Sequence, residues 1–178
     1  QQLPSGTTLA MMIVANQGRR LLAHIGSGDY LTVSQIDLSR AWRSPGSSLK
    51  PFIYGMGFET RRMHPETRFI DQPGAVDDYD PVNFDGRYRG EISLRRALQL
   101  SLNTPAVAVL RQVGSQRLLQ RFADAGVELR LPQHATAGLP IALGGVGTTL
   151  EQLVTLYAGL ADQDRVCPLN GLFQQSDH

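Results

Sequence analysis

Residues 44–52 read Ser-Pro-Gly-Ser-Ser-Leu-Lys-Pro-Phe, a turn that leads directly into an apolar segment. The Pro-Gly pair predicts the turn, and the residues from Ser47 to Phe58 predict a helix. Pro51 is compatible with this helix only because it falls in the first turn. Residues three apart share one face of a helix, so Ser47 and Lys50 are expected to be neighbours where the helix begins.

Ser47 and Lys50 have the chemistry of a nucleophile and its base. A serine hydroxyl is a weak nucleophile until a base takes its proton, and a neutral lysine amine can do so. An ordinary lysine has a pKa of ~10.4 and is neutral in about 1 in 2,500 molecules at pH 7, so burial or a neighbouring cation must favour the neutral form. Ser48 is a poorer candidate, because residues two apart do not face each other. On this pair alone, a capped helix with a solvated lysine is the favoured interpretation.

The composition narrows the classes of protein that fit. The chain has 178 residues, 42% of them hydrophobic, which suits one domain or a large part of one. With a net charge of +1, nothing in the charge balance suggests a nucleic-acid or membrane-surface partner. Lys50 is the single lysine among seventeen basic residues, which sets this amine apart. Cys167 is the single cysteine and cannot close an internal disulfide.

We identify no signal-peptide pattern in these residues, and no apolar run is long enough to cross a bilayer. It begins with Gln-Gln, and we interpret it as a segment of a longer protein. Apolar runs and turn residues predict a hairpin of two strands, at 9–15 and 20–25. A loop rich in Asp, Pro, Gly and Asn is expected at 71–90. Helical periodicity predicts four later helices, at 91–100, 104–113, 115–125 and 150–161, the last capped by Thr148 or Thr149.

Several segments resemble one enzyme family. Residues 44–52 closely resemble the nucleophile motif of penicillin-binding transpeptidases. Residues 79–86 (Tyr-Asp-Pro-Val-Asn-Phe-Asp-Gly) resemble the loop before the family's second motif, and residues 101–106 (Ser-Leu-Asn-Thr-Pro-Ala) resemble that Ser-x-Asn motif. Residues 143–149 (Leu-Gly-Gly-Val-Gly-Thr-Thr) resemble the stretch before the last helix that precedes the third motif. The resemblance covers about residues 9–165 and is to the transpeptidase domain of bifunctional class A penicillin-binding proteins, within them to the 1C type.

The resemblance implies a fold and a reaction. The fold would be mixed α/β (α+β), of the serine β-lactamase and D,D-transpeptidase type, with an antiparallel sheet that is incomplete here and a flanking helical subdomain. Residues 1–165 would be a partial transpeptidase domain, and 166–178 a terminal tail of uncertain origin. The reaction would cross-link peptidoglycan stem peptides ending in D-Ala-D-Ala through an acyl-enzyme on Ser47, which β-lactams would also acylate.

Roles for single residues follow from the same resemblance. Lys50 would be the general base, Ser101 would relay a proton to the leaving nitrogen, and Asn103 would orient Lys50 and the substrate amide. No cofactor, metal or nucleic acid is implied. The longer protein would carry an N-terminal glycosyltransferase domain and a membrane anchor, and would work on the periplasmic side of the bacterial inner membrane.

The chain departs from the family pattern in one respect. The third motif, Lys-Thr-Gly, is absent, and no lysine follows Lys50. In the family the edge strand that carries this motif supplies an oxyanion N–H group, and losing one such donor commonly lowers the rate 10²- to 10³-fold. We therefore expect this chain by itself to be catalytically impaired and marginally stable.

Three other functions remain open from the sequence. A class A β-lactamase shares the first two motifs, but the segment at Glu151, Glu-Gln-Leu-Val-Thr, does not match that family's Glu-x-x-Leu-Asn. A D,D-carboxypeptidase differs only in its acceptor. A non-catalytic module that binds β-lactams or peptidoglycan is the third. For metals, neither the Asp-rich loop nor the four scattered histidines have a ligand spacing.

Overall fold

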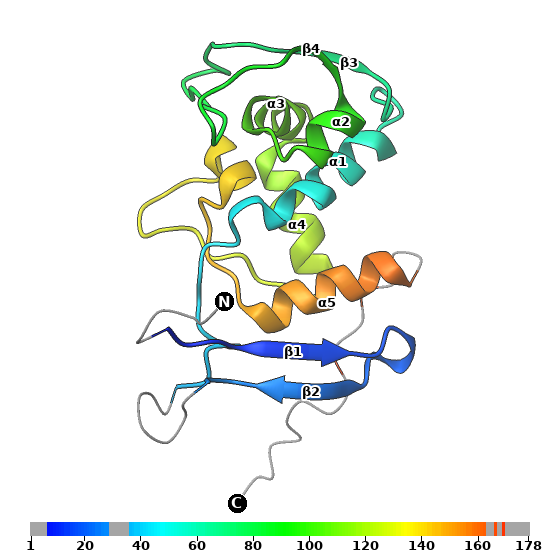
Figure 1. Ribbon diagram of the computed structural model, residues 1–178, viewed down its shortest axis with the longest axis vertical. Helices are drawn as coiled ribbons and strands as arrows, with labels where there is room; N and C mark the ends of the chain where they lie inside the picture. Colours follow the sequence, from blue (N-terminus) through cyan, green and yellow to red (C-terminus); the bar gives the residue numbers. More distant parts are fainter. Residues whose placement is uncertain (1–6, 29–35, 163–165, 167–168, 170–178) are drawn as a thin grey trace, which may run out of the picture. The chain divides into compact units, whose positions relative to one another are not determined.

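The structure, a computed structural model, describes residues 7–28, 36–162, 166 and 169. Figure 1 labels its strands and α-helices in chain order. The strands are β1 (Met11–Val14), β2 (Leu21–Ile25), β3 (Arg68–Asp71) and β4 (Gly90–Ser93). The α-helices are α1 (Lys50–Glu59), α2 (Leu94–Gln99), α3 (Asn103–Val113), α4 (Ser115–Asp124) and α5 (Leu150–Ala161). Three short 3-10 helices are η1 (Gln17–Arg19), η2 (Gly46–Leu49) and η3 (Leu139–Leu143).

The chain divides into two compact units. Unit 1 comprises residues 1–43, 124–128 and 148–178, and unit 2 comprises residues 44–123 and 129–147. The first contains β1, β2 and α5, and the second contains β3, β4 and the other α-helices. None of the helices in the described ranges is both long and apolar enough to pass through a membrane.

In unit 1 a hairpin packs against a helix. β1 and β2 pair antiparallel, from Met11 opposite Ile25 to Val14 opposite Leu21, and α5 lies against β1 (Figure 1). The start of α5 has a complete capping box: Thr149 accepts from the backbone N–H of Gln152, whose side chain accepts from the N–H of Thr149. The predicted hairpin and the predicted Thr149 cap are therefore both confirmed.

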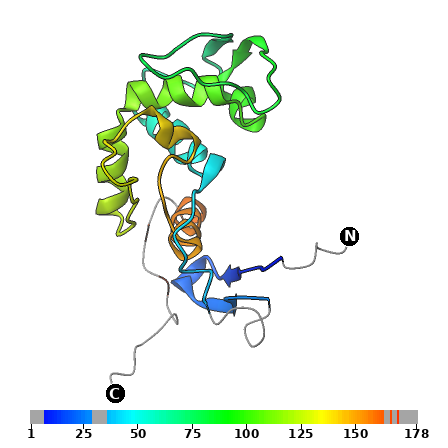
Figure 2. The same cartoon turned by 90° about the vertical axis from the view of Figure 1, so that its left-hand side faces the viewer.

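Unit 2 is built around two helices that pack on each other. α3, seen nearly end-on in Figure 1, runs across the view in Figure 2, with α1 and η3 packed against it. Gly57 allows the close approach of α1, because a Cβ there would come within 2.9 Å of Val109 Cγ1. Phe52 of α1 meets Phe122 of α4 edge to face, with ring centroids 5.5 Å apart. This core fixes the first turn of α1, where the predicted nucleophile lies.

β3 and β4 form a second antiparallel pair that the sequence did not predict. Phe69 lies opposite Ile92, and Asp71 opposite Gly90. The helix expected from residue 91 is therefore wrong in its first turn: residues 91–93 are strand, and α2 begins only after Ser93, whose side chain caps it. The expected loop at 71–90 lies between the two strands.

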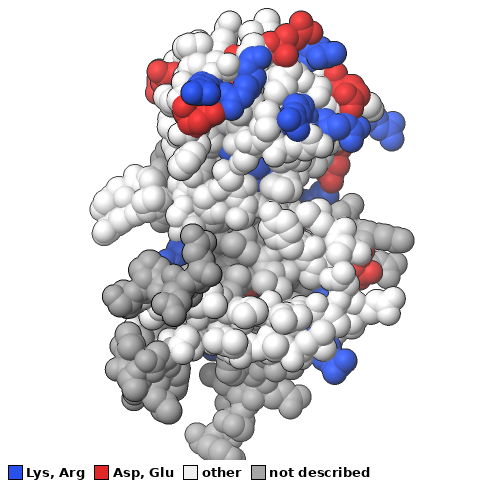
Figure 3. Space-filling view, in the orientation of Figure 1, with Lys and Arg blue, Asp and Glu red and all other residues white. Residues whose placement is uncertain are grey.

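Charges on this unit are paired locally. Figure 3 shows basic and acidic side chains interspersed over the part of unit 2 that includes β3 and β4. Arg89 lies 2.6 Å from Asp85, and Arg68 lies 3.7 Å from Glu91. Such exposed pairs contribute roughly 0–1 kcal/mol each to stability. The unit thus presents mixed charge on this face, without a patch of one sign.

Candidate active site

The predicted nucleophile and base lie where η2 passes into α1. Ser47 is exposed on η2, and Lys50, the first residue of α1, is 1% exposed. The backbone N–H of Lys50 donates to the carbonyl oxygen of Ser47. In a 3-10 turn residues three apart eclipse each other, so the two side chains leave the same face. Pro51 sits in the first turn of α1, where its missing N–H has no consequence.

The Lys50 amine is held by the second predicted motif. Its Nζ donates to the carbonyl oxygen of Ser101 at 2.6 Å and to Asn103 Oδ1 at 2.7 Å, and it lies 3.3 Å from Ser101 Oγ. Ser101 has a left-handed backbone with φ of 53°, which an L-residue adopts at a cost of about 1–2 kcal/mol. Its carbonyl group accepts from Lys50 in this conformation. The structure thus brings Lys50, Ser101 and Asn103 together.

Burial prepares Lys50 to act as a base. Removal of the amine from water lowers the pKa of Lys50 from its ordinary value of 10.5 to about 8. The three oxygen atoms around Nζ match the three protons of the ammonium form. When Lys50 loses a proton, its lone pair can accept from the Ser101 hydroxyl, which then changes from acceptor to donor. Ser101 and Lys50 can therefore exchange a proton without moving.

The orientation of the Asn103 side chain is fixed from both ends. Its Nδ2 donates to the carbonyl oxygen of Val82 at 2.6 Å, which leaves Oδ1 to accept from Lys50. Its backbone N–H donates to Asn83 Oδ1 at 2.7 Å. Asn83 belongs to the loop before the second motif, and the sequence did not identify it as a site residue. It could have been identified only by its position within the Tyr-Asp-Pro-Val-Asn segment.

The turn that carries Ser47 is braced by a glycine far along the chain. Ser44 Oγ donates to the carbonyl oxygen of Gly144 at 2.7 Å. Gly144 has φ of 90°, and a Cβ there would come within 2.6 Å of the Gly46 nitrogen. Only glycine allows these two backbones to approach so closely. The Gly-rich segment at 144–147 therefore has a structural role beside the nucleophile.

Ser47 itself stands apart from the hydrogen-bonded group. Its Oγ makes no hydrogen bond to Lys50 Nζ among the described residues, and its side chain faces solvent. The hydroxyl is thus accessible to a substrate, three residues before a buried amine. Both two-stranded sheets in the described ranges lack a further strand.

A second serine, in unit 1, has histidine and aspartate neighbours but a different geometry. Ser39 Oγ donates to Asp37 Oδ1 at 2.6 Å, and His24 Nε2 lies 2.8 Å from Ser39 Oγ. Burial opposes ionisation of Asp37, but the hydrogen bonds from Ser39 and the positive charges of His24 and Arg40 lower the pKa of this carboxyl. Ser39 is 1% exposed and its proton is committed to the carboxylate. This cluster is structural, because the Ser39 hydroxyl donates its proton to Asp37 and not to a base, and because a substrate cannot reach it.

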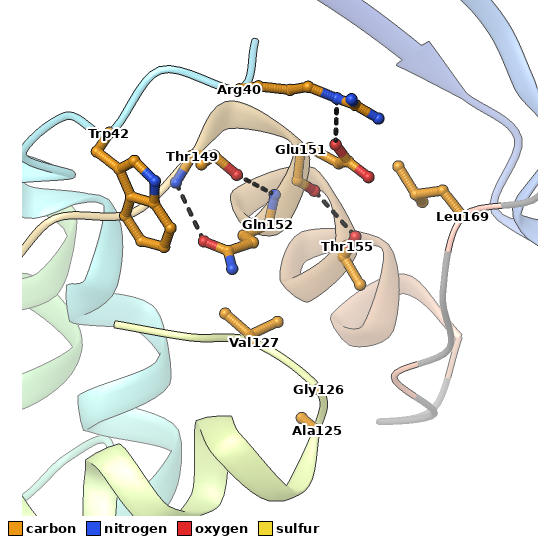
Figure 4. Close-up of a pocket in the computed structure, with 10 residues that line it drawn as sticks. All are labelled: Arg40, Trp42, Ala125, Gly126, Val127, Thr149, Glu151, Gln152, Thr155 and Leu169. Carbon is orange, nitrogen blue, oxygen red and sulfur yellow. Dashed lines mark hydrogen bonds and ion pairs between the residues drawn. The ribbon is translucent and has the colours of Figure 1, made fainter. Parts of the chain in front are cut away.

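Figure 4 shows a pocket of about 490 Å³ within unit 1. The residues that line it are Arg40, Trp42, Ala125, Gly126, Val127, Thr149, Glu151, Gln152, Thr155 and Leu169. Its polar groups are already engaged with one another, through the Thr149–Gln152 capping box and the Arg40 Nε–Glu151 Oε2 pair at 3.6 Å. The four predicted catalytic residues all lie in unit 2 and do not line it. We assign this pocket no part in the chemistry.

Comparisons with known proteins agree with this geometry. The family model described as the penicillin-binding protein transpeptidase domain matches residues 9–169. The chain is 38% identical over 163 residues to penicillin-binding protein 1C of Escherichia coli (strain K12), covering 90% of this chain and 21% of the relative. It is 32% identical over 136 residues to penicillin-binding protein 1F of Bacillus subtilis (strain 168), covering 76% of this chain and 18% of that relative. The chain thus spans about a fifth of the length of these relatives.

Solved structures share the fold. Penicillin-binding protein 1A from Haemophilus influenzae has a TM-score of 0.75 at 23% identity, over 85% of this chain and 23% of that chain. PonA1 from Mycobacterium tuberculosis, solved in complex with penicillin V, has a TM-score of 0.76 at 20% identity, over 89% of this chain and 44% of that chain. The fold class expected from the sequence is therefore confirmed.

Proposed function

The chain belongs to the penicillin-binding protein transpeptidase domain family, and from this premise we propose that it carries the nucleophile of a D,D-transpeptidase, with Ser47 as the acyl acceptor and Lys50 as the base. The observation that carries the proposal is the environment of Lys50. This single lysine is buried, its pKa is lowered to about 8, and its amine donates hydrogen bonds to Ser101 and Asn103. A solvated structural lysine would have neither the burial nor the lowered pKa.

In the proposed reaction, Ser47 Oγ attacks the carbonyl carbon of the D-Ala-D-Ala bond in a stem peptide, and its proton passes to neutral Lys50. The C–N bond then breaks as the Ser101 hydroxyl gives its proton to the leaving nitrogen and takes one from protonated Lys50. Free D-Ala leaves, and the stem remains as an ester on Ser47. An amine of a neighbouring stem attacks this ester, the C–O bond breaks, and a new amide cross-link forms while Ser47 regains its proton.

β-Lactams would acylate the same serine, because their ring amide takes the place of the D-Ala-D-Ala bond. We propose that this chain reacts slowly by itself, since it lacks a Lys-Thr-Gly motif and the oxyanion N–H group that this motif implies. We further propose that the intact protein carries a glycosyltransferase domain and a membrane anchor, and works at the periplasmic face of the inner membrane. The class A resemblance and the short share of the relatives that this chain covers support this extension.

Mass spectrometry of the chain after prolonged exposure to penicillin tests the assignment. We expect one adduct, mapped to Ser47 and lost in Ser47→Ala. Ser48→Ala is the matched control and should keep the adduct, because Ser48 does not share a face with Lys50. An adduct on another residue, or none after prolonged exposure, contradicts the proposal. Labelling as fast as that of a full-length homologue contradicts the proposed impairment.

The acceptor is tested separately. A stem-peptide substrate is incubated with and without an amine acceptor, and the products are separated. A cross-linked product that depends on the amine supports transpeptidation. Only the shortened peptide, in both reactions, identifies a D,D-carboxypeptidase, and an acyl adduct without either product identifies a non-catalytic binding module.

A further inference from the structure

A buried carboxylate lies two hydrogen bonds from Asn103. Asp71 ends β3 and is 1% exposed. Its two oxygens accept from Asn83 Nδ2 at 3.0 Å each, its Oδ2 accepts from the Arg89 backbone N–H at 2.8 Å, and its Oδ1 accepts from the Thr104 hydroxyl. Within the described part of the chain, Asp71 takes part in no ion pair. The hydrogen-bond donors that hold this carboxyl group are all neutral, and a carboxyl group is costly to bury unless its hydrogen bonds are satisfied, so its four contacts carry structural weight.

Asn83 connects this carboxylate to the start of α3. It is 3% exposed, and every polar group of its side chain is used. Nδ2 donates to Asp71 and to the carbonyl oxygen of Arg87 at 2.9 Å, and Oδ1 accepts from the Asn103 backbone N–H at 2.7 Å. The opposite side-chain orientation would set donor against donor at Asn103. Asp71 and the Arg87 carbonyl together determine which way Asn83 faces, and Asn83 in turn holds the Asn103 backbone.

Two consecutive residues of α3 are tied to the same carboxylate. Asn103 is tied through Asn83, and Thr104 is tied directly. On α1, burial and the negative charge of Asp71 together raise the pKa of Tyr54. The carboxylate thus joins the end of β3, the loop at 82–89 and the start of α3.

We propose that Asp71 and Asn83 are positioning residues that hold Asn103 so that its Oδ1 stays on the Lys50 amine. This inference rests on the proposed function, since it assigns the network to the base of that reaction. Without the network, the backbone of Asn103 is released, its amide can rotate, and water reaches the amine. Neither residue touches the substrate in this scheme. They act through Asn103 alone.

The single lysine makes a direct test possible. The full chain is produced with lysine labelled with ¹³C at Cε, so one resonance reports the protonation of Lys50 without any reaction. In Asp71→Asn and in Asn83→Asp the donors and acceptors no longer match. We expect the pKa of Lys50 to rise by one unit or more, because the entry of water reverses the effect of burial and outweighs the loss of the Asn103 acceptor. Acylation by saturating penicillin at pH 7 should fall about tenfold or more, because the neutral fraction falls tenfold per unit. The penicillin concentration that gives half the maximal rate should stay unchanged.

Two further variants separate positioning from mere stability. The swap Asp71→Asn/Asn83→Asp restores a donor facing an acceptor between positions 71 and 83 with the same net charge, although the Arg87 carbonyl loses its donor. It should bring the pKa of Lys50 well below that of either single variant. Asp77→Asn, in the same loop but exposed in an ion pair with Arg111, should change neither reading. If the single variants do not fold, the swap decides, since a folded swap with the Lys50 pKa near 10 overturns the inference.

The outcomes for the two proposals can be told apart. If the wild-type chain has a lowered Lys50 pKa but penicillin never acylates it, the proposed function is contradicted and the positioning role is not. Single variants that are less stable but keep the wild-type Lys50 pKa and acylation rate overturn the positioning role alone. In that case Asp71 and Asn83 only stabilise the fold.

Discussion

Raising the pH from 6 to 10 should reveal Lys50 as the base. With a pKa of about 8, about one molecule in eleven has neutral Lys50 at pH 7, against about one in 3,000 for a lysine at 10.5. Burial thus provides about 300-fold more of the active form, equivalent to about 3 kcal/mol. The rate of penicillin acylation at Ser47, followed by intact mass, should rise about tenfold from pH 6 to 7 and level off above pH 9.

The same protonation change appears in stability, with a definite sign. Between about pH 8 and 10.5 the unfolded chain keeps a proton on Lys50 that the folded chain has released. The unfolded state then binds more protons, so the free energy of unfolding rises with pH across this window, by at most about 3 kcal/mol. Denaturant titrations at several pH values measure it. Lys50→Met, which cannot titrate, should lack this part of the pH dependence.

Two results would refute this reasoning. An acylation rate that keeps rising tenfold per unit through pH 9 and 10 would mean that Lys50 has an ordinary pKa despite its burial. An equal pH dependence of stability in wild type and Lys50→Met would mean that another group titrates in the window. A single Cε resonance of labelled lysine gives the pKa independently of both.

Substitutions at Ser101, Tyr54 and Gly144 test other features of unit 2. Ser101→Gly should be about 1 kcal/mol more stable than Ser101→Ala, since glycine tolerates φ of 53°. Both variants should block substrate turnover, because both remove the hydroxyl. Chemical denaturation measures the stability difference and product analysis measures the turnover; equal stability of the two variants would contradict the backbone strain at Ser101. Tyr54→Phe should raise the free energy of unfolding by about 1 kcal/mol, because within the described residues the buried Tyr54 hydroxyl has no hydrogen-bond partner; a loss of stability contradicts it. Gly144→Ala should lower the free energy of unfolding by about 2 kcal/mol or more, and should slow acylation by displacing the Gly46 backbone. Gly138→Ala is the control: no atom lies closer than 3.5 Å to the new Cβ, so stability and acylation rate should change little.

Local patterns were enough to predict most elements. The α5 cap at Thr149 followed from a Thr-Thr pair before a periodic apolar segment, and the observed helix is residues 150–161 as expected. β3 and β4 were missed because each has only four residues and neither alternates clearly. Residues 91–93 were assigned to a helix because Ile92 fits the apolar periodicity of α2. Pairing with β3 decides otherwise, and such pairing is not local information.

The site shows the same division between local and distant information. The spacing of Ser47 and Lys50 is local, and it could be predicted. The lowered pKa of Lys50 depends on burial and on acceptors at Ser101 and Asn103, about fifty residues away. Asp71 was the least accessible to sequence reasoning: an aspartate beside an Asp-rich loop indicates a solvated turn, yet its partners at 83 and 104 bury it.

The location of these residues separates activation of the nucleophile from stabilisation of the oxyanion. Ser47, Lys50, Ser101, Asn103, Asp71 and Asn83 all belong to unit 2, so we expect the lowered pKa of Lys50 not to depend on unit 1. The described sequence contains no Lys-Thr-Gly motif, and we propose that the chain therefore lacks the oxyanion N–H group that this motif implies. The chain should therefore show the lowered pKa of Lys50 together with slow acylation, because only the tetrahedral stage of the reaction lacks a hydrogen-bond donor. A chain with slow acylation and an unshifted Lys50 would instead place its defect in the base, and would show that the preparation of Lys50 depends on more than unit 2.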